Sequence, residues 1–296
     1  MKVLDSNNLR IGLAGLTTND YKKTYNTLLE TCRKSNFLAL EMEFLNVNKL
    51  SSYPSIAIIK KLSSIATKNQ IKISVHAPYY INLASTNNQT VNFSLQHIIK
   101  SLRIAQIFQS YIVVHAGFYQ QTNHRKSINK VIESLKKLNS LIEKENQIKI
   151  SHLTLETPGK FSSIGTIDEL IKIANIIGCS ICIDWGHLYA RKPSDITQRN
   201  IINIIDKIET NIDIKYWHMH ISGIKRNNKG EVKHLSFRKS FFPVDIVVNT
   251  LKEIGLKGTL ICESPERFKK DTYYLLKIYE TGKIPFPRLK RLDDFL

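Results

Sequence analysis

Short apolar runs alternate with longer amphipathic segments along most of this 296-residue chain. Each run is rich in Val, Ile and Leu, as is typical of parallel strands that are buried on both faces. Eight such strands are predicted, at Arg10–Gly15, Phe37–Glu43, Ile71–His76, Tyr111–His115, Ile150–Glu156, Ser180–Asp184, Lys215–Ser222 and Gly258–Glu263.

Between these runs, apolar residues recur at steps of three and four, which predicts helices that pack one face on a sheet. Thr166-Ile-Asp-Glu169 predicts a capping box at the start of one helix, and Gly178 predicts its end. The clearest helical patterns lie at Ile56–Ile65, Ile98–Phe108, Ile128–Leu138 and Ile167–Ala174.

Strict alternation of eight strands with about eight helices indicates repeated parallel βαβ units. Such a series in just under 300 residues favours an α/β fold with a single (β/α)8 TIM barrel. An open doubly wound sheet competes with it, but no Gly-x-Gly-x-x-Gly follows the first strand. We expect one barrel domain over residues 1–296, with a short basic surface tail from about residue 282, where two prolines break the helical pattern.

Ionisable side chains stand at the ends of six consecutive predicted strands. The carboxyl ends of barrel strands converge on one mouth, and alternation along each strand turns these side chains inward. Buried carboxylates without a compensating charge cost several kcal/mol each, so we expect a cluster of divalent cations. Mixed imidazole and carboxylate ligands favour zinc or manganese over magnesium or calcium. The residues are His76, His115, Glu156, Asp184, His218 with His220, and Glu263.

Two further histidines lie just beyond the strands, His187 in Asp184-Trp-Gly-His187 and His234 after strand seven. Both are candidate ligands. In the Asp-x-x-His spacing, the carboxylate and the imidazole project from the same turn and can each bind at one of two neighbouring metal sites. His97, His124, His152 and, less clearly, His218 are interpreted as structural or solvated. Cys179-x-x-Cys182 is interpreted as part of a buried strand and not as a redox or zinc motif.

The order and spacing of six motifs resemble the endonuclease IV family of zinc-dependent apurinic/apyrimidinic (AP) endonucleases, and the similarity covers nearly the whole barrel. The motifs are His76-Ala-Pro-Tyr-Tyr-Ile-Asn82, Val114-His115-Ala-Gly117, Leu155-Glu156-Thr-Pro-Gly159, Ile183-Asp184-Trp-Gly-His187, His218-Met-His220-Ile-Ser-Gly223 and Leu260-Ile-Cys-Glu263-Ser-Pro265.

The resemblance implies three zinc ions and assigns their ligands. His76, His115 and Glu156 would hold the first; Glu156, Asp184, His220 and Glu263 the second; and His187 and His234 the third. In the family, the remaining ligand of the third zinc is an Asp two residues before the histidine that corresponds to His234. This chain has Val232 at that position. Glu231 is the nearest carboxylate and is our candidate substitute. Ser222-Gly223 also replaces the family's Asn-Asp, as in a divergent branch.

The resemblance further implies hydrolysis of duplex DNA on the 5′ side of an abasic site, leaving a 3′-hydroxyl and a 5′-deoxyribose phosphate. Glu156 and Glu263 are the expected catalytic carboxylates, with Glu263 orienting the nucleophile. Tyr79 and Tyr80 resemble the family's loop that inserts into bent DNA, although either ring could instead pack the barrel rim. Lys225 and Arg226 are expected to contact phosphates, the alternative being a solvated loop.

Composition fits this interpretation. Lys and Arg number 43 against 25 Asp and Glu, and the net charge of +18 favours a polyanionic partner, although a generally Lys-rich composition would also produce it. The sequence has no apolar run long enough for a membrane span, no apolar amino-terminal signal and four Cys. We therefore expect a reduced cytoplasmic or nucleoid protein with no membrane partner, and the resemblance to endonuclease IV implies a monomer.

Two alternatives stay open. A sugar isomerase or epimerase of the xylose-isomerase-like barrels would bind one metal through Glu156, Asp184, His220 and Glu263, and would not need the other histidines or the positive charge. A non-enzymatic nucleic-acid-binding barrel would lack some ligands, and only Val232 indicates that.

Overall fold

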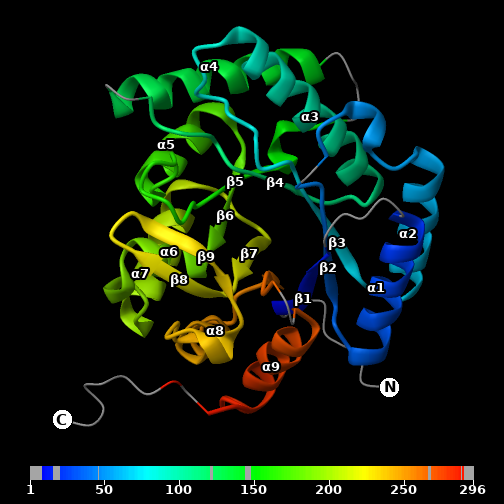
Figure 1. Cartoon of the computed structure of the whole chain (residues 1–296), viewed down its shortest axis with the longest axis vertical. Helices are drawn as coiled ribbons and strands as arrows, with labels where there is room; N and C mark the ends of the chain where they lie inside the picture. Colours follow the sequence, from blue (N-terminus) through cyan, green and yellow to red (C-terminus); the bar gives the residue numbers. More distant parts are fainter. Residues whose placement is uncertain are drawn as a thin grey trace.

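Eight parallel strands close into a barrel surrounded by helices in the computed structural model (Figure 1). The structure describes residues 9–15, 21–45, 47–120, 123–143, 148–265, 268–287 and 289. Around the barrel the strands follow the order β1-β10-β7-β6-β5-β4-β3-β2, and every neighbouring pair is parallel. The predicted (β/α)8 fold is therefore confirmed. The barrel strands are β1 (Leu9–Gly15), β2 (Ala39–Glu43), β3 (Lys72–His76), β4 (Ile112–Val114), β5 (Leu153–Glu156), β6 (Ser180–Asp184), β7 (Trp217–Ile221) and β10 (Gly258–Cys262).

The helices fall where the apolar spacing predicts them. In the helix that starts at Ile167, Thr166 Oγ1 accepts a hydrogen bond from the Glu169 amide, and the Glu169 carboxylate accepts one from the Thr166 amide. Gly178 ends this helix with a φ of 78°, which favours glycine. The described helices are α1 (Tyr21–Ser35), α2 (Ile56–Lys68), α3 (Asn88–Ile107), α4 (His124–Ile142), α5 (Ile167–Ile177), α6 (Trp185–Arg191), α7 (Gln198–Asn211), α8 (Val244–Glu253) and α9 (Phe268–Thr281).

Some strands begin later than the apolar runs suggest. Residues Ile150–His152 form a 3-10 turn before β5, and β7 starts at Trp217 instead of Lys215. Strict alternation also fails once, because α6 and α7 both follow β6. Asp184 starts α6 directly at the strand end, where its Oδ1 accepts a hydrogen bond from the His187 amide at 2.7 Å. Residue 288 and residues 290–296 of the predicted carboxy-terminal tail lie outside the described residues.

The segment after β7 is a β-hairpin, whereas the sequence predicted a loop. Strands β8 (Gly223–Asn227) and β9 (Gly230–Leu235) pair antiparallel beside α6 (Figure 1). Lys225 pairs with Lys233, but Arg226 pairs with Glu231, so Val232 is an extra residue in a β-bulge. A bulge reverses the alternation of side chains beyond it, and this brings Glu231 to the same face as His234.

Candidate metal centre

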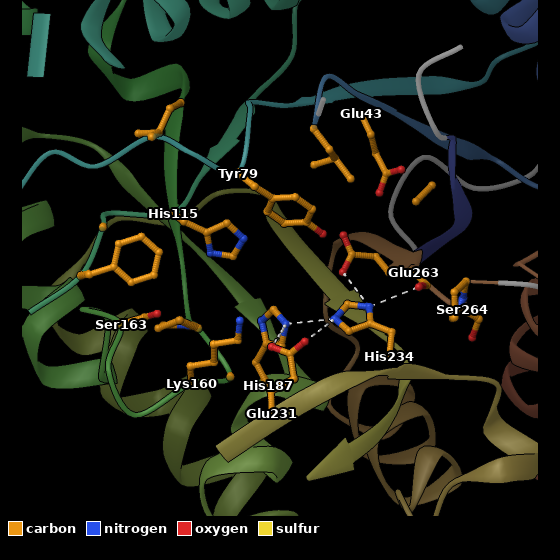
Figure 2. Close-up of a pocket in the computed structure, with 18 residues that line it drawn as sticks. Glu43, Tyr79, His115, Lys160, Ser163, His187, Glu231, His234, Glu263 and Ser264 are labelled. Carbon is orange, nitrogen blue, oxygen red and sulfur yellow. Dashed lines mark hydrogen bonds and ion pairs between the residues drawn. The ribbon is translucent and has the colours of Figure 1, made fainter. Parts of the chain in front are cut away.

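A cavity of about 610 Å³ opens at the carboxyl ends of the barrel strands. Its volume is in the range of sites that take a small ligand or a single nucleotide. Figure 2 shows imidazoles and carboxylates pointing into it from the barrel and from the hairpin. The predicted site residues in its wall are Tyr79, His115, His187, Glu231, His234 and Glu263.

Glu156 lies at the centre of the site, below the open cavity, and is almost completely buried. Its Oε2 is 3.1 Å from His76 Nε2 and 3.2 Å from His115 Nε2. Its Oε1 is 3.2 Å from His187 Nδ1 and 3.3 Å from His220 Nδ1. Burial would raise the pKa of Glu156, but the surrounding imidazoles, His115 and His220 foremost, hold it well below its usual value. Burial lowers the pKa of His115 to about 4, which leaves this ring neutral and able to bind a metal. We call His76, His115 and Glu156 the first ligand group.

The second ligand group consists of Glu156, Asp184, His220 and Glu263, whose ligand atoms all lie within 4.8 Å of one another. The register of the barrel helps to assemble it, because Asp184 pairs with His220 across β6 and β7. His220 Nδ1 is 3.2 Å from Glu263 Oε1. Asp184 Oδ2 is buried and has no hydrogen-bond partner among the described residues. Burial and repulsion from Glu156 and Asp184 raise the pKa of Glu263 well above its usual value, against the attraction of His220.

The third ligand group is His187, His234 and Glu231, and it joins α6 to the hairpin. His187 Nε2 lies 3.1 Å from His234 Nε2 and 3.3 Å from Glu231 Oε2, while His234 Nε2 lies 3.6 Å from Glu231 Oε1 (Figure 2). The bulge at Val232 explains how a carboxylate three residues before His234 reaches the same point. Val232 itself is 44% exposed.

The spacing of the ligand atoms fits bound metal. Two ligand atoms at about 2.0–2.1 Å from a tetrahedral zinc ion are about 3.3 Å apart. The contacts within the three groups that involve Glu156, His187 and His220 lie between 3.1 and 3.3 Å. His187 Nε2 and His234 Nε2 face one another, and the buried Asp184 Oδ2 has no hydrogen-bond partner among the described residues. Bound cations would give these atoms the partners that buried polar groups normally have. The residues present therefore fit divalent metal ions.

Two buried carboxylates were missed by the sequence analysis. Glu41 is wholly buried below the ligand groups; its Oε2 accepts hydrogen bonds from Ser74 Oγ at 2.8 Å and from His218 Nε2 at 2.8 Å, and its Oε1 is 2.9 Å from His220 Nε2. Glu43 lines the cavity two residues further along β2 and pairs in register with His76. Burial raises the pKa of Glu43 to about 7.

Glu41 and His218 together support His220 from below. His218 Nδ1 shares a hydrogen bond with Thr259 Oγ1 at 2.6 Å, so this histidine is bound on both ring nitrogens and lies outside the cavity. Cys182 is buried beside the two histidines, and its thiol is free, as are those of the other three cysteines.

The two tyrosines predicted to contact DNA point in different directions. Tyr79 is 48% exposed and lines the cavity, with its ring 5.7 Å from that of His76 and 5.6 Å from that of His115. Tyr80 packs against Phe93 and His97 on α3, and its hydroxyl is 3.4 Å from His97 Nδ1. Tyr80 is thus outside the cavity wall, as the alternative of rim packing expects.

Basic residues lie on the hairpin and in the cavity wall. Lys225 and Arg226 are exposed on β8, where Arg226 Nε donates a hydrogen bond to the Ala190 carbonyl at 2.9 Å. Lys160, which the sequence analysis did not single out, lines the cavity beside His187 and Glu231 (Figure 2). It lies in the β5–α5 connection, held to the hairpin by a hydrogen bond from the Glu231 amide to the Gly159 carbonyl at 3.0 Å. None of the described helices has both the length and the apolar character of a bilayer span.

Two relatives are similar to this chain in sequence over most of its length. An uncharacterized protein of Methanocaldococcus jannaschii is 32% identical over 255 residues, which cover 85% of this chain and 90% of that protein. A probable endonuclease 4 of Aster yellows witches'-broom phytoplasma is 27% identical over 254 residues, 79% of this chain and 82% of that protein.

Solved structures share the fold at lower identity. Endonuclease IV from Thermus thermophilus superposes with a TM-score of 0.72 at 14% identity, covering 92% of this chain and 98% of that one. A D-tagatose 3-epimerase-like protein superposes with a TM-score of 0.68 at 20% identity, covering 92% and 97%. The model of the family described as Xylose isomerase-like TIM barrel matches residues 29–276. The chain therefore belongs to the xylose isomerase-like TIM barrel family, and within it resembles endonuclease IV.

Proposed function

We propose that this protein is a zinc-dependent AP endonuclease, which hydrolyses the phosphodiester 5′ to an abasic site in duplex DNA. The observation that carries the proposal is the third ligand group. A single-metal sugar epimerase needs only a cluster such as Glu156, Asp184, His220 and Glu263, whereas His187, His234 and Glu231 form a further site at 3.1–3.6 Å spacing. The net charge of +18 and the similarity to probable endonuclease 4 proteins support the same substrate class.

Three zinc ions would be held by the three ligand groups. When bound, zinc supplies Lewis-acid stabilisation of phosphate charge and lowers the pKa of water to about 7. Glu156 has one oxygen towards His76 and His115 and the other towards His187 and His220, so it would supply ligand atoms to two of the groups. Glu263, at the cavity wall between the second and third groups, would accept a hydrogen bond from the attacking water and orient it in line with the phosphorus.

Substrate selection would use the shape of the mouth. A nucleotide without its base is easier to extrude from a duplex, because less stacking is lost. Tyr79 is exposed at the rim and could fill the gap that the extruded residue leaves. Lys225 and Arg226 on β8, and Lys160 beside the hairpin, would contact the phosphates flanking it.

The deciding experiment uses a duplex with one tetrahydrofuran abasic analogue. We expect a single nick 5′ to the analogue, with loss of activity in a chelator and recovery on adding zinc. An undamaged duplex of the same sequence is the control. Absence of nicking by protein that contains its metals would contradict the proposal.

A sugar epimerase or isomerase is the second candidate, because the second ligand group alone could hold one metal and an epimerase-like protein shares the fold. Metal analysis separates the two. About three zinc ions per chain support the nuclease, and one manganese ion together with turnover of a ketohexose supports the epimerase.

A further inference from the structure

A second cavity, of about 570 Å³, lies at the opposite end of the barrel from the candidate metal centre. It is formed where the strands begin, by Arg10 of β1, Lys72 of β3, and residues just before β4, β5 and β7. We call it the lower cavity. The charged, aromatic and hydroxyl side chains in its wall include those of Arg10, Lys72, Ser110, Tyr111, His152 and Tyr216.

The lower cavity carries positive charge with no acidic residue among the described residues that line it. Arg10 Nη1 donates to the Gln70 carbonyl at 3.0 Å, and Lys72 Nζ donates to the Gln109 carbonyl at 2.8 Å. Both cations are therefore held by neutral backbone groups that leave their charge uncompensated. Burial and, to a lesser extent, repulsion from Arg10 lower the pKa of Lys72.

Two hydroxyl groups in the same wall also lack partners. Ser110 is 3% exposed, and its Oγ has no hydrogen-bond partner among the described residues. The buried hydroxyl of Tyr216 lies beside the Arg10 guanidinium, but no hydrogen bond of regular geometry joins it to a described residue. Burial raises the pKa of Tyr216 to about 12, so the group keeps its proton and remains a donor. Buried polar groups are nearly always satisfied in folded proteins, and an unsatisfied pair beside two cations indicates a missing acceptor.

We propose that the lower cavity binds a small oxyanion of the phosphate class, with Arg10 and Lys72 supplying charge and Ser110 and Tyr216 donating hydrogen bonds. The anion is either free phosphate or the phosphomonoester of a small metabolite. The rings of Tyr111 and His152, 6.3 Å apart and nearly perpendicular, flank the place where the remainder of a phosphomonoester would lie. This site is separate from the metal centre and does not depend on the proposed nuclease activity.

The test is a titration of the full-length, metal-loaded protein with inorganic phosphate and, in a second arm, with adenosine 5′-monophosphate. The ring protons of His152 report binding at the lower cavity by NMR, whereas phosphate at the metal centre leaves them unchanged. We expect a saturable shift. If phosphate saturates the shift and the nucleotide binds no more tightly, the ligand is free phosphate. If the nucleotide has the lower Kd, the ligand is a phosphomonoester.

Matched variants locate the contacts. Ser110→Ala and Tyr216→Phe remove hydroxyls that make no hydrogen bond to the described residues, so they should fold normally and retain any activity at the metal centre. Each should weaken binding about tenfold, as expected for a hydrogen bond to a charged group. Lys72→Met should weaken it further, and Lys136→Met, on the exposed face of α4, should not. Unchanged binding in both hydroxyl variants, or no shift of His152 up to about 10 mM phosphate, would overturn the proposal.

Discussion

Replacing Glu231 by Gln tests whether the bulged hairpin supplies the last ligand of the third group. In the structure Glu231 Oε2 lies 3.3 Å from His187 Nε2, while Val232 is turned away and is 44% exposed. Glu231→Gln keeps the size of the side chain but removes the negative charge. The endonuclease IV family, which this chain resembles, has an Asp at the position of Val232, so Val232→Asp is the matched variant.

The expected loss of zinc affinity follows from dividing the free energy of zinc binding equally among the ligands. A structural zinc site contributes about 10–16 kcal/mol, or about 3 kcal/mol for each of roughly four ligands, which corresponds to roughly a hundredfold in affinity. We therefore expect Glu231→Gln to lose one zinc ion per chain on dialysis against a weak chelator, and to nick abasic DNA at least tenfold more slowly. Val232→Asp alone should change neither quantity.

The double variant Glu231→Gln/Val232→Asp gives the sharpest result. A carboxylate at position 232 projects from the opposite face of the bulge, so it should not restore the lost ion. Metal content is measured by mass spectrometry on gel-filtered protein, with circular dichroism to confirm folding. Full recovery of zinc and activity in the double variant would refute the bulged register and place the ligand at position 232.

Further outcomes follow from other residues of the site. Glu263→Gln should reduce nicking by at least about a thousandfold while leaving the circular dichroism spectrum unchanged, since it removes the group that orients the attacking water; an active variant would contradict this role. Glu41→Gln should lower zinc affinity about 10- to 100-fold in a competition with a chromogenic chelator, because Glu41 orients His220 through Nε2; unaltered affinity would show that packing alone fixes the ring. Tyr79→Ala should weaken binding of abasic duplex by about 1–3 kcal/mol in fluorescence anisotropy, and Tyr80→Phe should leave it unchanged; equal losses would mean that both rings contact DNA.

The strand ends could be predicted because two simple rules act together. Side chains alternate along a strand, and the carboxyl ends of barrel strands meet at one mouth, so residues such as Glu156 and His220 had to converge once the barrel was recognised. The same alternation could have identified Glu41 and Glu43. They stand two apart in a short apolar strand, which turns both inward, but neither belongs to a motif of the resembled family.

Other features could not be read from the pattern. In a regular strand, residues three apart lie on opposite faces, so Glu231 and His234 would not be expected to meet. Only the bulge at Val232 brings them together, and a bulge depends on hydrogen bonding between two strands and not on local sequence. Tyr79 and Tyr80 are adjacent, and their opposite orientations follow from where Phe93 and His97 lie on α3.

The balance of charge bears on the choice between one metal and several. The ligand atoms of Glu156, Asp184 and Glu263 lie within 4.8 Å of one another, and Glu231 adds a fourth carboxylate in the third ligand group, 3.3 Å from His187. One divalent ion would compensate two of these carboxylates and leave the others to be neutralised by protons or by charged imidazoles. The raised pKa of Glu263 expresses that deficit of positive charge, since burial and the neighbouring carboxylates both disfavour its charged form. Three divalent ions would supply six positive charges, which is enough to balance these four carboxylates together with the buried Glu41 and Glu43, whereas a single ion is not.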